Sequence, residues 1–178
     1  MDKKLINIID KFSISGGILS GIMICSGFTL VIAEIIIRTI FNSTLYISEE
    51  YSGYLICGLT FVALGFTLKE KGHIRMTFLH NILKDTRHKL IIDMVCYVIG
   101  FAFSIGVTYF TGMFFWDSVI NSSRSMQISE TYLAIPQFFM PFGSLMLALQ
   151  FIAEFLKSSM ALKTGEFKVI EEERDLGR

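Results

Sequence analysis

The sequence predicts an all-α integral membrane protein with four transmembrane helices. Of its 178 residues, 52% are hydrophobic and only 18% are charged, whereas a typical soluble domain has about 25% charged residues. Mean hydropathy is +0.57. The apolar residues also lie in long uncharged runs, and a soluble domain of this size has too little interior to bury them. These observations place the chain in a membrane.

Four uncharged runs are long enough to cross a bilayer. They cover residues 12–33, 51–68, 94–116 and 131–153, and a hydrocarbon core of about 30 Å requires about 20 residues of helix. Helix is expected because each backbone polar group must be satisfied within its own segment. The predicted spans are about 12–37, 51–68, 90–116 and 131–156. We expect residues 1–178 to form a single membrane domain, with 157–178 as a polar cytoplasmic tail.

The distribution of basic residues predicts the orientation of the spans. Fourteen of the 16 lysines and arginines lie before span 1, between spans 2 and 3, or after span 4. Only Arg38 and Arg124 lie in the two other loops. Since basic residues accumulate on the cytoplasmic side, both termini and the middle loop are predicted to be inside. Topology accounts for these residues, so no nucleic-acid partner is expected. The first run is too long for a signal-peptide core and is expected to remain as span 1.

Residues 72–88, in the middle loop, are predicted to form an amphipathic cytoplasmic helix between spans 2 and 3. Five apolar side chains fall within one half of a helical wheel: Met76, Phe78, Leu79, Ile82 and Leu83. Such a helix suits the membrane interface. It could instead pack on a partner protein, and the sequence leaves both interpretations open.

The residues able to carry chemistry exclude several function classes. The three cysteines lie inside spans with no histidine or second cysteine at metal-ligand spacing, so they are interpreted as packing residues. All three histidines lie in the middle loop, which excludes a haem held between helices by two histidines. The sequence has no phosphate-binding glycine loop and no convergent acid, base and nucleophile. We therefore expect neither an enzyme nor a metal or cofactor site in this chain.

Each acidic residue near a span has a basic residue within about one helical turn. The pairs are Glu34 with Arg38, Asp93 with Lys89, and Glu154 with Lys157. Asp93 is also expected at a helix N-terminus, where the helix dipole favours an anion. An acid in a span can carry protons, so an alternative function is a self-sufficient homodimeric proton-coupled antiporter that uses Glu34. Its place near a helix end, beside Arg38, favours a structural ion pair.

Span 1 is rich in small residues. Nine glycines, serines and threonines lie between residues 13 and 29, too many for a single stripe that faces the rest of the chain. Small residues allow helix backbones to approach closely in a bilayer, where hydrophobicity does not drive association. We therefore predict that span 1 packs on more than one side, and that Gly17 and Gly21 contribute to contact with another chain.

Four short motifs, in order along the chain, resemble those of a known transporter family. Arg38-Thr39-Ile40-Phe41 is similar to its Arg-x-x-Phe, and Glu49-Glu50 to its paired acids before span 2. Gly72-His73-Ile74 is similar to its Gly-His-Ile segment. Pro136 and the later Pro141-Phe142-Gly143 are similar to its Pro…Pro-x-Gly pattern. With this helix count and topology, the chain resembles the small membrane subunit (Q subunit, DctQ-like) of tripartite ATP-independent periplasmic (TRAP) transporters.

The resemblance implies a non-catalytic subunit of a sodium-driven secondary transporter in the bacterial inner membrane. In that family the small subunit forms a scaffold with a large membrane subunit, which carries the substrate and sodium sites. A periplasmic solute-binding protein captures the solute, usually an organic acid, and docks on the membrane pair. The implied partners are these two proteins and membrane lipid, and sodium is expected on the large subunit.

The resemblance also marks candidate positions at the partner interface. They are Arg38, Glu49, Glu50, Gly72, His73, Pro136, Pro141 and Gly143. Structural explanations stay open for two groups. The paired acids can stabilise the N-terminus of span 2 through the helix dipole, and the prolines can shape span 4 without touching a partner.

Overall fold

The computed structural model gives the backbone of residues 2–70 and 86–164 and the side chains of residues 4–70 and 89–162. Most of these residues are helical, in α1 (Asp2–Phe41), α2 (Ile47–Lys69), α4 (Thr86–Ile120), α5 (Ala134–Gln137) and α6 (Phe139–Thr164). Within these ranges the only β-type pairing is an antiparallel bridge between Arg124 and Tyr132. In this described part of the chain, four segments are long and apolar enough to cross a membrane. The predicted all-α class with four spans is therefore confirmed.

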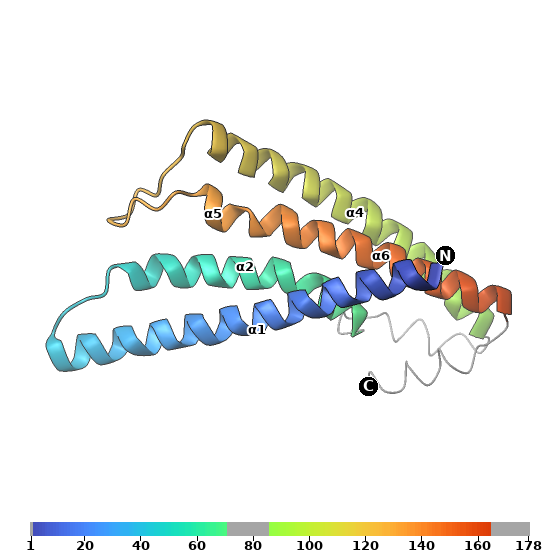
Figure 1. Cartoon of the computed structure of the whole chain (residues 1–178), viewed down its shortest axis with the longest axis horizontal. Helices are drawn as coiled ribbons and strands as arrows, with labels where there is room; N and C mark the ends of the chain where they lie inside the picture. Colours follow the sequence, from blue (N-terminus) through green and yellow to red (C-terminus); the bar gives the residue numbers. More distant parts are fainter. Residues whose placement is uncertain (1, 71–85, 165–178) are drawn as a thin grey trace.

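Two antiparallel helix pairs form the molecule, α1 with α2 and α4 with α6 (Figure 1). Helix α6 packs against all three of the other long helices, and its span has the largest share buried within the chain. Helix α4 packs mainly on α6 and α5, and α1 buries the smallest share of its span. The core therefore follows α6, whereas α1 lies at the periphery with most of its apolar surface exposed.

Helices α1 and α4 are longer than the spans that hydropathy predicts. The 40 residues of α1 measure about 60 Å at 1.5 Å per residue, and they extend beyond the predicted span 12–37 at both ends. Helix α4 begins at Thr86, before the predicted span 90–116. Asp93 is therefore buried two turns inside the helix. Its predicted place at a helix N-terminus is wrong, because the helix continues through the polar residues that precede the apolar run.

The fourth span is interrupted at Phe138, between α5 and α6. Pro141 lacks an N–H, and in a regular helix its ring would clash with the carbonyl of Gln137 four residues earlier. The Phe138 ring stacks on Phe142 at a centroid distance of 5.6 Å and meets Phe115 of α4 edge-on at 5.8 Å. Residues 131–133, predicted to lie in the span, belong to the preceding loop.

Helix α6 approaches its neighbours through small residues. At Gly143 an added Cβ would lie 2.4 Å from the carbonyl carbon and oxygen of Phe61 in α2, closer than such atoms can approach. On the other side of α6, Thr108 of α4 donates a 3.0 Å hydrogen bond to the Ser144 hydroxyl. Close backbones and hydrogen bonds between helices stabilise helix association in lipid. These contacts hold α6 between α2 and α4.

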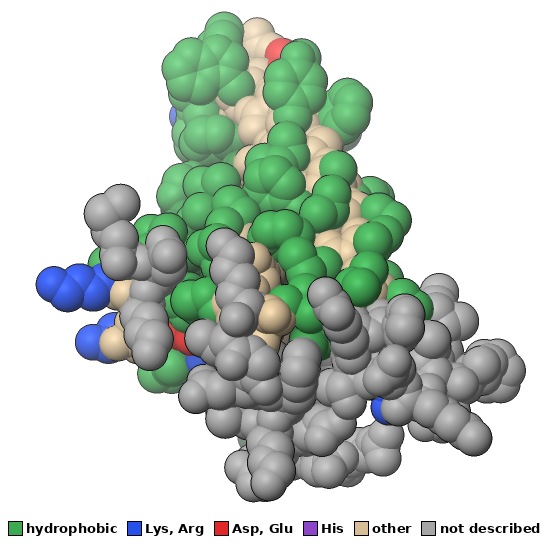
Figure 2. All heavy atoms as spheres, turned by 90° about the vertical axis from the view of Figure 1, so that its right-hand side faces the viewer, with side chains coloured by type: hydrophobic (Ala, Val, Ile, Leu, Met, Phe, Trp, Pro, Cys, Tyr) green, Lys and Arg blue, Asp and Glu red, His purple; other side chains and the backbone are tan. Residues whose placement is uncertain are grey.

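The surface of the chain is largely apolar. Large hydrophobic side chains are exposed along α1 and α4, among them Phe28, Phe103 and Phe110. Hydrophobic side chains cover most of the coloured surface in the space-filling view (Figure 2). Exposing such surface to water would cost about 25 cal/mol per Å². With four helices of spanning length, this surface is that of a multi-pass membrane protein.

Candidate partner interface

One face of α1 packs against the rest of the chain. Ser13 and Gly16 are buried there, and an added Cβ at Gly16 would lie 3.0 Å from the carbonyl oxygen of Val62 in α2. At Gly17 an added Cβ would lie 2.6 Å from the ring of Phe66, also in α2. The small residue at position 17 is thus explained by a contact within the chain. A contribution of Gly17 to contact with another chain stays a prediction.

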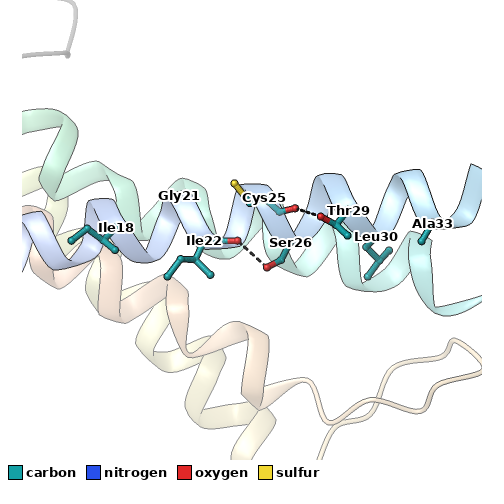
Figure 3. Close-up of a pocket in the computed structure, with 8 residues that line it drawn as sticks. All are labelled: Ile18, Gly21, Ile22, Cys25, Ser26, Thr29, Leu30 and Ala33. Carbon is teal, nitrogen blue, oxygen red and sulfur yellow. Dashed lines mark hydrogen bonds between the residues drawn. The ribbon is translucent and has the colours of Figure 1, made fainter.

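Another face of α1 is open. An added Cβ at Gly21 would meet no described atom within 4 Å. A shallow hollow runs along this face from Ile18 to Ala33 and is lined only by α1 residues (Figure 3). Gly21, Cys25, Thr29 and Ala33 recur in it at intervals of four residues. The Thr29 hydroxyl donates to the Cys25 carbonyl at 2.9 Å, so its polar group is satisfied within the helix. Small residues thus lie on more than one side of α1.

The Pro…Pro-x-Gly residues shape α5 and α6. Pro136 lies in α5, and Pro141 lies in the first turn of α6, where backbone N–H groups have no partner in the helix. Gly143 faces the backbone of α2 at Phe61. These positions support the structural explanation for the pattern. Contact with a partner at any of the three stays a prediction.

Glu34 is held by three hydrogen bonds near the C-terminal end of α1. Its Oε1 accepts from Arg38 Nε at 3.1 Å and Nη2 at 2.7 Å, and its Oε2 accepts from the Leu45 N–H at 2.7 Å. The Glu34 side chain is 12% exposed and that of Arg38 is 66% exposed. The predicted ion pair is confirmed, and Glu34 also fixes the loop that leads into α2. The Arg38 guanidinium is accessible to a partner.

The paired acids in the first turn of α2 have different surroundings. Glu49 is exposed, whereas Glu50 is buried. Glu50 Oε1 accepts from the Tyr54 hydroxyl at 2.6 Å, and Oε2 accepts a short hydrogen bond from the Ser129 hydroxyl in the loop between α4 and α5. Both carboxylates lie at the positive end of the α2 dipole. Glu50 therefore joins the two helix pairs, while Glu49 is accessible from outside the chain.

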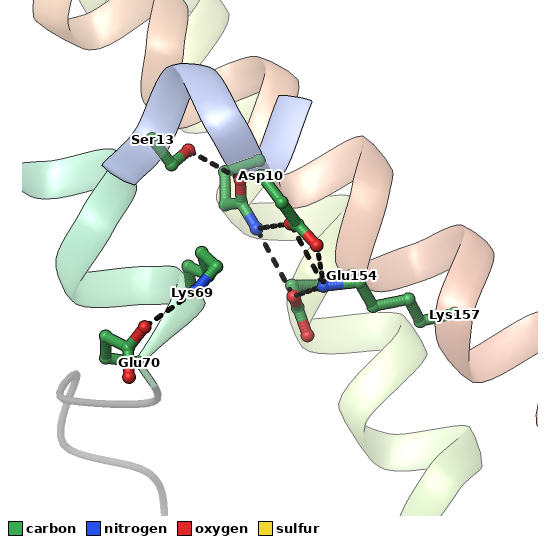
Figure 4. A network of polar contacts seen from close by, with 7 residues as sticks. Asp10, Ser13, Lys69, Glu70, Glu154 and Lys157 are labelled. Carbon is green, nitrogen blue, oxygen red and sulfur yellow. Dashed lines mark hydrogen bonds and ion pairs between the residues drawn. The ribbon is translucent and has the colours of Figure 1, made fainter. Parts of the chain in front are cut away.

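A polar cluster joins the N-terminal part of α1 to α6 (Figure 4). The buried Gln150 is its centre. The Gln150 oxygen accepts from the Ser13 hydroxyl at 2.6 Å, and its amide nitrogen donates to Asp10 at 3.1 Å and to Glu154 at 3.3 Å. Lys157 Nζ lies 3.1 Å from Asp10 and 2.9 Å from Glu154. The predicted pair of Glu154 and Lys157 is confirmed, and both residues also take part in a contact between helices.

The sequence did not predict the part of this cluster that crosses between helices. The available signal was Gln150, a polar residue inside an uncharged run, four residues before Glu154 and seven before Lys157. That spacing places the three side chains on one face of a helix. Their partners on α1, Asp10 and Ser13, could be identified only once the packing of α1 on α6 was known.

Two candidate interface residues, Gly72 and His73, lie outside the described residues, as does the predicted amphipathic helix up to residue 85. Among the residues that the structure describes, no group of three or more His, Cys, Asp and Glu side chains could hold a metal ion. The three cysteines are free thiols.

Comparison with known proteins assigns the chain to a family. The family model described as "Tripartite ATP-independent periplasmic transporters, DctQ component" matches residues 27–160, well over half of the chain. The chain belongs to the DctQ family. No curated protein and no solved structure matches it. The resemblance to the small membrane subunit of TRAP transporters is thereby confirmed.

The DctQ match covers only part of the candidate interface. It includes Arg38, the paired acids Glu49-Glu50 and the segment 136–143, but it begins after Gly17 and Gly21. For those two glycines, support for a role in partner contact therefore comes only from the geometry of α1. The DctQ family is a transporter component and generally non-catalytic.

In this DctQ subunit, Glu34→Gln is expected to leave transport largely intact. Glutamine keeps an acceptor for the Leu45 N–H and loses only the partly exposed ion pair with Arg38, which is worth at most about 1 kcal/mol. Glu34→Ala also removes that acceptor and should lower the amount of assembled protein. Solute uptake, divided by the amount of assembled transporter in the membrane, measures both effects. Complete loss of uptake in Glu34→Gln at normal assembly would indicate a proton-carrying carboxylate instead.

Proposed function

We propose that this DctQ chain is a scaffold subunit of a sodium-driven, binding-protein-dependent secondary transporter that imports organic acids. It pairs with the large membrane subunit, which carries the solute and sodium sites, and it helps to dock the periplasmic solute-binding protein. The chain resides in the bacterial inner membrane with both termini in the cytoplasm, as its 14 basic residues in those segments and the middle loop favour. The main support for this proposal is the open face of α1 at Gly21, in a chain that belongs to the DctQ family.

The open face of α1 suits a transmembrane helix of the large subunit. Lipid tails are as apolar as leucine, so close packing rather than apolar burial selects a protein partner in the bilayer. Small residues at Gly21, Cys25 and Thr29 leave a hollow that side chains of a second helix can enter. On its other face α1 is fixed to α6 by the cluster of Asp10 and Ser13 with Gln150. In the proposed complex, helix α1 therefore lies between the core of this chain and the large subunit.

Gly21→Leu is expected to raise the dissociation constant for the large subunit about tenfold, which corresponds to about 1.4 kcal/mol of association free energy, and so to lower the amount that co-purifies. Leucine would fill the hollow and hold the two backbones apart. The matched control is Gly106→Leu in α4, where an added Cβ also meets no described atom within 4 Å. The tagged chain is co-expressed with its genomic neighbours and purified in mild detergent, and the ratio of the two subunits is quantified.

Four experimental outcomes would count against the proposal. Recovery of the chain alone, as a homodimer that transports solute after reconstitution, would refute the role of an accessory subunit. Equal losses for Gly21→Leu and Gly106→Leu, or no loss for Gly21→Leu, would exclude the open face of α1 as the specific contact. Uptake by the three reconstituted components that persists without external sodium would refute sodium coupling.

A further inference from the structure

The loop between α4 and α5, residues 121–133, presents two apolar side chains at its tip. The loop folds back on itself, and the Ser125 N–H donates to the Thr131 carbonyl at 2.9 Å. Met126 is fully exposed and Ile128 is 78% exposed. Figure 1 shows this loop extending beyond the ends of α4 and α5. We call Met126 and Ile128 the apolar tip.

Side-chain hydrogen bonds fix the apolar tip relative to α2. The Ser129 hydroxyl, one residue after Ile128, donates to the buried carboxylate of Glu50. The Thr131 hydroxyl donates to the Tyr51 hydroxyl at 3.2 Å. A loop already held in one conformation loses less conformational freedom on binding than a free loop does. The apolar tip is therefore preorganised for contact with a partner.

Lipid tails do not account for the exposure of the apolar tip. Charged residues lie between it and the apolar parts of the helices. Asp117 stands near the end of α4, Glu50 stands in the first turn of α2, and Arg124 and Glu130 flank the tip as an exposed pair 3.7 Å apart. Charged side chains are costly within the hydrocarbon and therefore mark its boundary. The tip lies beyond that boundary, where exposed apolar side chains rimmed by polar groups mark protein contact sites.

The charge at this end of the molecule indicates the kind of partner. The two loops and the adjoining helix ends carry five acids and two bases. Glu49, Asp117 and Glu130 are exposed, as are Arg38 and Arg124. Glu50 is buried and Glu34 is 12% exposed, but both add to the net negative charge of this end, which we call the acidic rim. A second copy of the chain would present the same acidic rim and be repelled, whereas a surface with a basic rim would be attracted. Of the components of the proposed transporter, the soluble solute-binding protein is the one that approaches from the aqueous phase outside.

We propose that the apolar tip anchors the solute-binding protein on the membrane complex. Met126 and Ile128 enter an apolar socket on that protein, and basic residues around the socket face the acidic rim of this chain. A few apolar anchors surrounded by polar contacts supply most of the affinity of a typical interface. The inference rests on the proposed function, because it requires the 121–133 loop to lie outside the cytoplasm.

Labelling at the tip tests its location and its contact. Ile128→Cys is placed in a chain that carries Cys25→Ala, Cys57→Ala and Cys96→Ala, assembled with the large subunit. Spheroplasts are treated with a membrane-impermeant maleimide. Rapid labelling is expected. A saturating concentration of the purified solute-binding protein is expected to slow it at least about tenfold, because a thiol covered by the bound protein does not react. Asn121 is exposed at the base of the same loop. Without the binding protein, Asn121→Cys should label as fast as Ile128→Cys.

Uptake measures the energetic role of the tip. The combined variant Met126→Ser and Ile128→Ser is tested in proteoliposomes that contain both membrane subunits. It is expected to raise about tenfold the concentration of solute-binding protein that gives half-maximal uptake, because apolar anchor residues supply much of the binding free energy of an interface. The maximal rate should persist, because the transport machinery is unchanged. Asn121→Ser is the matched control and should leave the half-maximal concentration unaltered.

The possible outcomes separate this inference from the proposed function. Labelling from outside that the binding protein does not slow, with an unchanged half-maximal concentration in the double variant, would overturn the inference and leave the proposed function standing. Labelling only after permeabilisation would overturn the orientation on which both rest. Slow labelling in lipid vesicles but fast labelling in detergent, each without the binding protein, would show a tip embedded in lipid and would also overturn the inference.

Discussion

Gly143→Leu is expected to abolish accumulation of the folded chain in the membrane, and Gly143→Ala to lower its free energy of unfolding by about 1–3 kcal/mol, the usual cost of overpacking. The added Cβ would lie 2.4 Å from the carbonyl carbon and oxygen of Phe61 and 2.8 Å from the Val62 nitrogen. Backbone atoms cannot rotate away as a side chain can. Helices α2 and α6 would therefore have to separate, and α6 is the helix that contacts all the other long helices.

Two glycines provide matched controls for Gly143. At Gly112 in α4 an added Cβ meets no described atom within 4 Å, and at Gly17 the nearest atoms that it meets belong to the ring of Phe66. Gly112→Ala should be neutral or slightly stabilising, because alanine favours helix over glycine by about 1 kcal/mol. Gly17→Ala should have an intermediate effect, since the Phe66 ring can move. Thermal unfolding of the purified variants in detergent ranks them, and equal stability of Gly143→Ala and Gly112→Ala would show that the α2–α6 contact is looser than the structure indicates.

Features that depend on one helix alone were predictable from the sequence. The number of spans follows from the lengths of the uncharged runs, because the bilayer imposes a minimum length on each helix. The pairs of Glu34 with Arg38 and Glu154 with Lys157 follow from spacing, because residues three or four apart share a helix face. Hydropathy underestimates the lengths of α1 and α4, because a helix can continue beyond the hydrocarbon core of the bilayer.

Features that depend on contact between helices were not predictable. Gly17 and Gly21 are one helical turn apart and look equivalent in the sequence. In the structure Gly17 faces the ring of Phe66, whereas Gly21 lies on the open face of α1. Glu50 binds the hydroxyl of Ser129, 79 residues away, while its neighbour Glu49 is exposed. A single sequence carries the periodicity of each helix but not the rotation of one helix against another, and that rotation decides which small or charged residue is available to a partner.

Lys157→Met is expected to destabilise the chain by about 2 kcal/mol, somewhat less than the 3–5 kcal/mol typical of breaking a fully buried ion pair. Lys157 is 30% exposed, and its Nζ lies within 3.1 Å of Asp10 and 2.9 Å of Glu154, whose side chains are 20% and 7% exposed. Methionine preserves the apolar stem but leaves two neighbouring carboxylates without a cation. The N-terminal part of α1 should then separate from α6, which would also displace the open face of α1 and weaken the proposed contact with the large subunit.

Neutralising the carboxylates separates the effect of lost charge balance from the effect of lost hydrogen bonds. The triple variant Asp10→Asn, Glu154→Gln and Lys157→Met should recover most of the lost stability, because it leaves no unpaired charge beside Gln150. Arg124→Gln is the control for a surface pair, with both partners largely exposed, and should change stability by less than about 0.5 kcal/mol. Thermal unfolding in detergent and co-purification of the large subunit are measured for each variant. If the triple variant is as unstable as Lys157→Met, then the lysine acts through its hydrogen bonds to Asp10 and Glu154 rather than by balancing their charge.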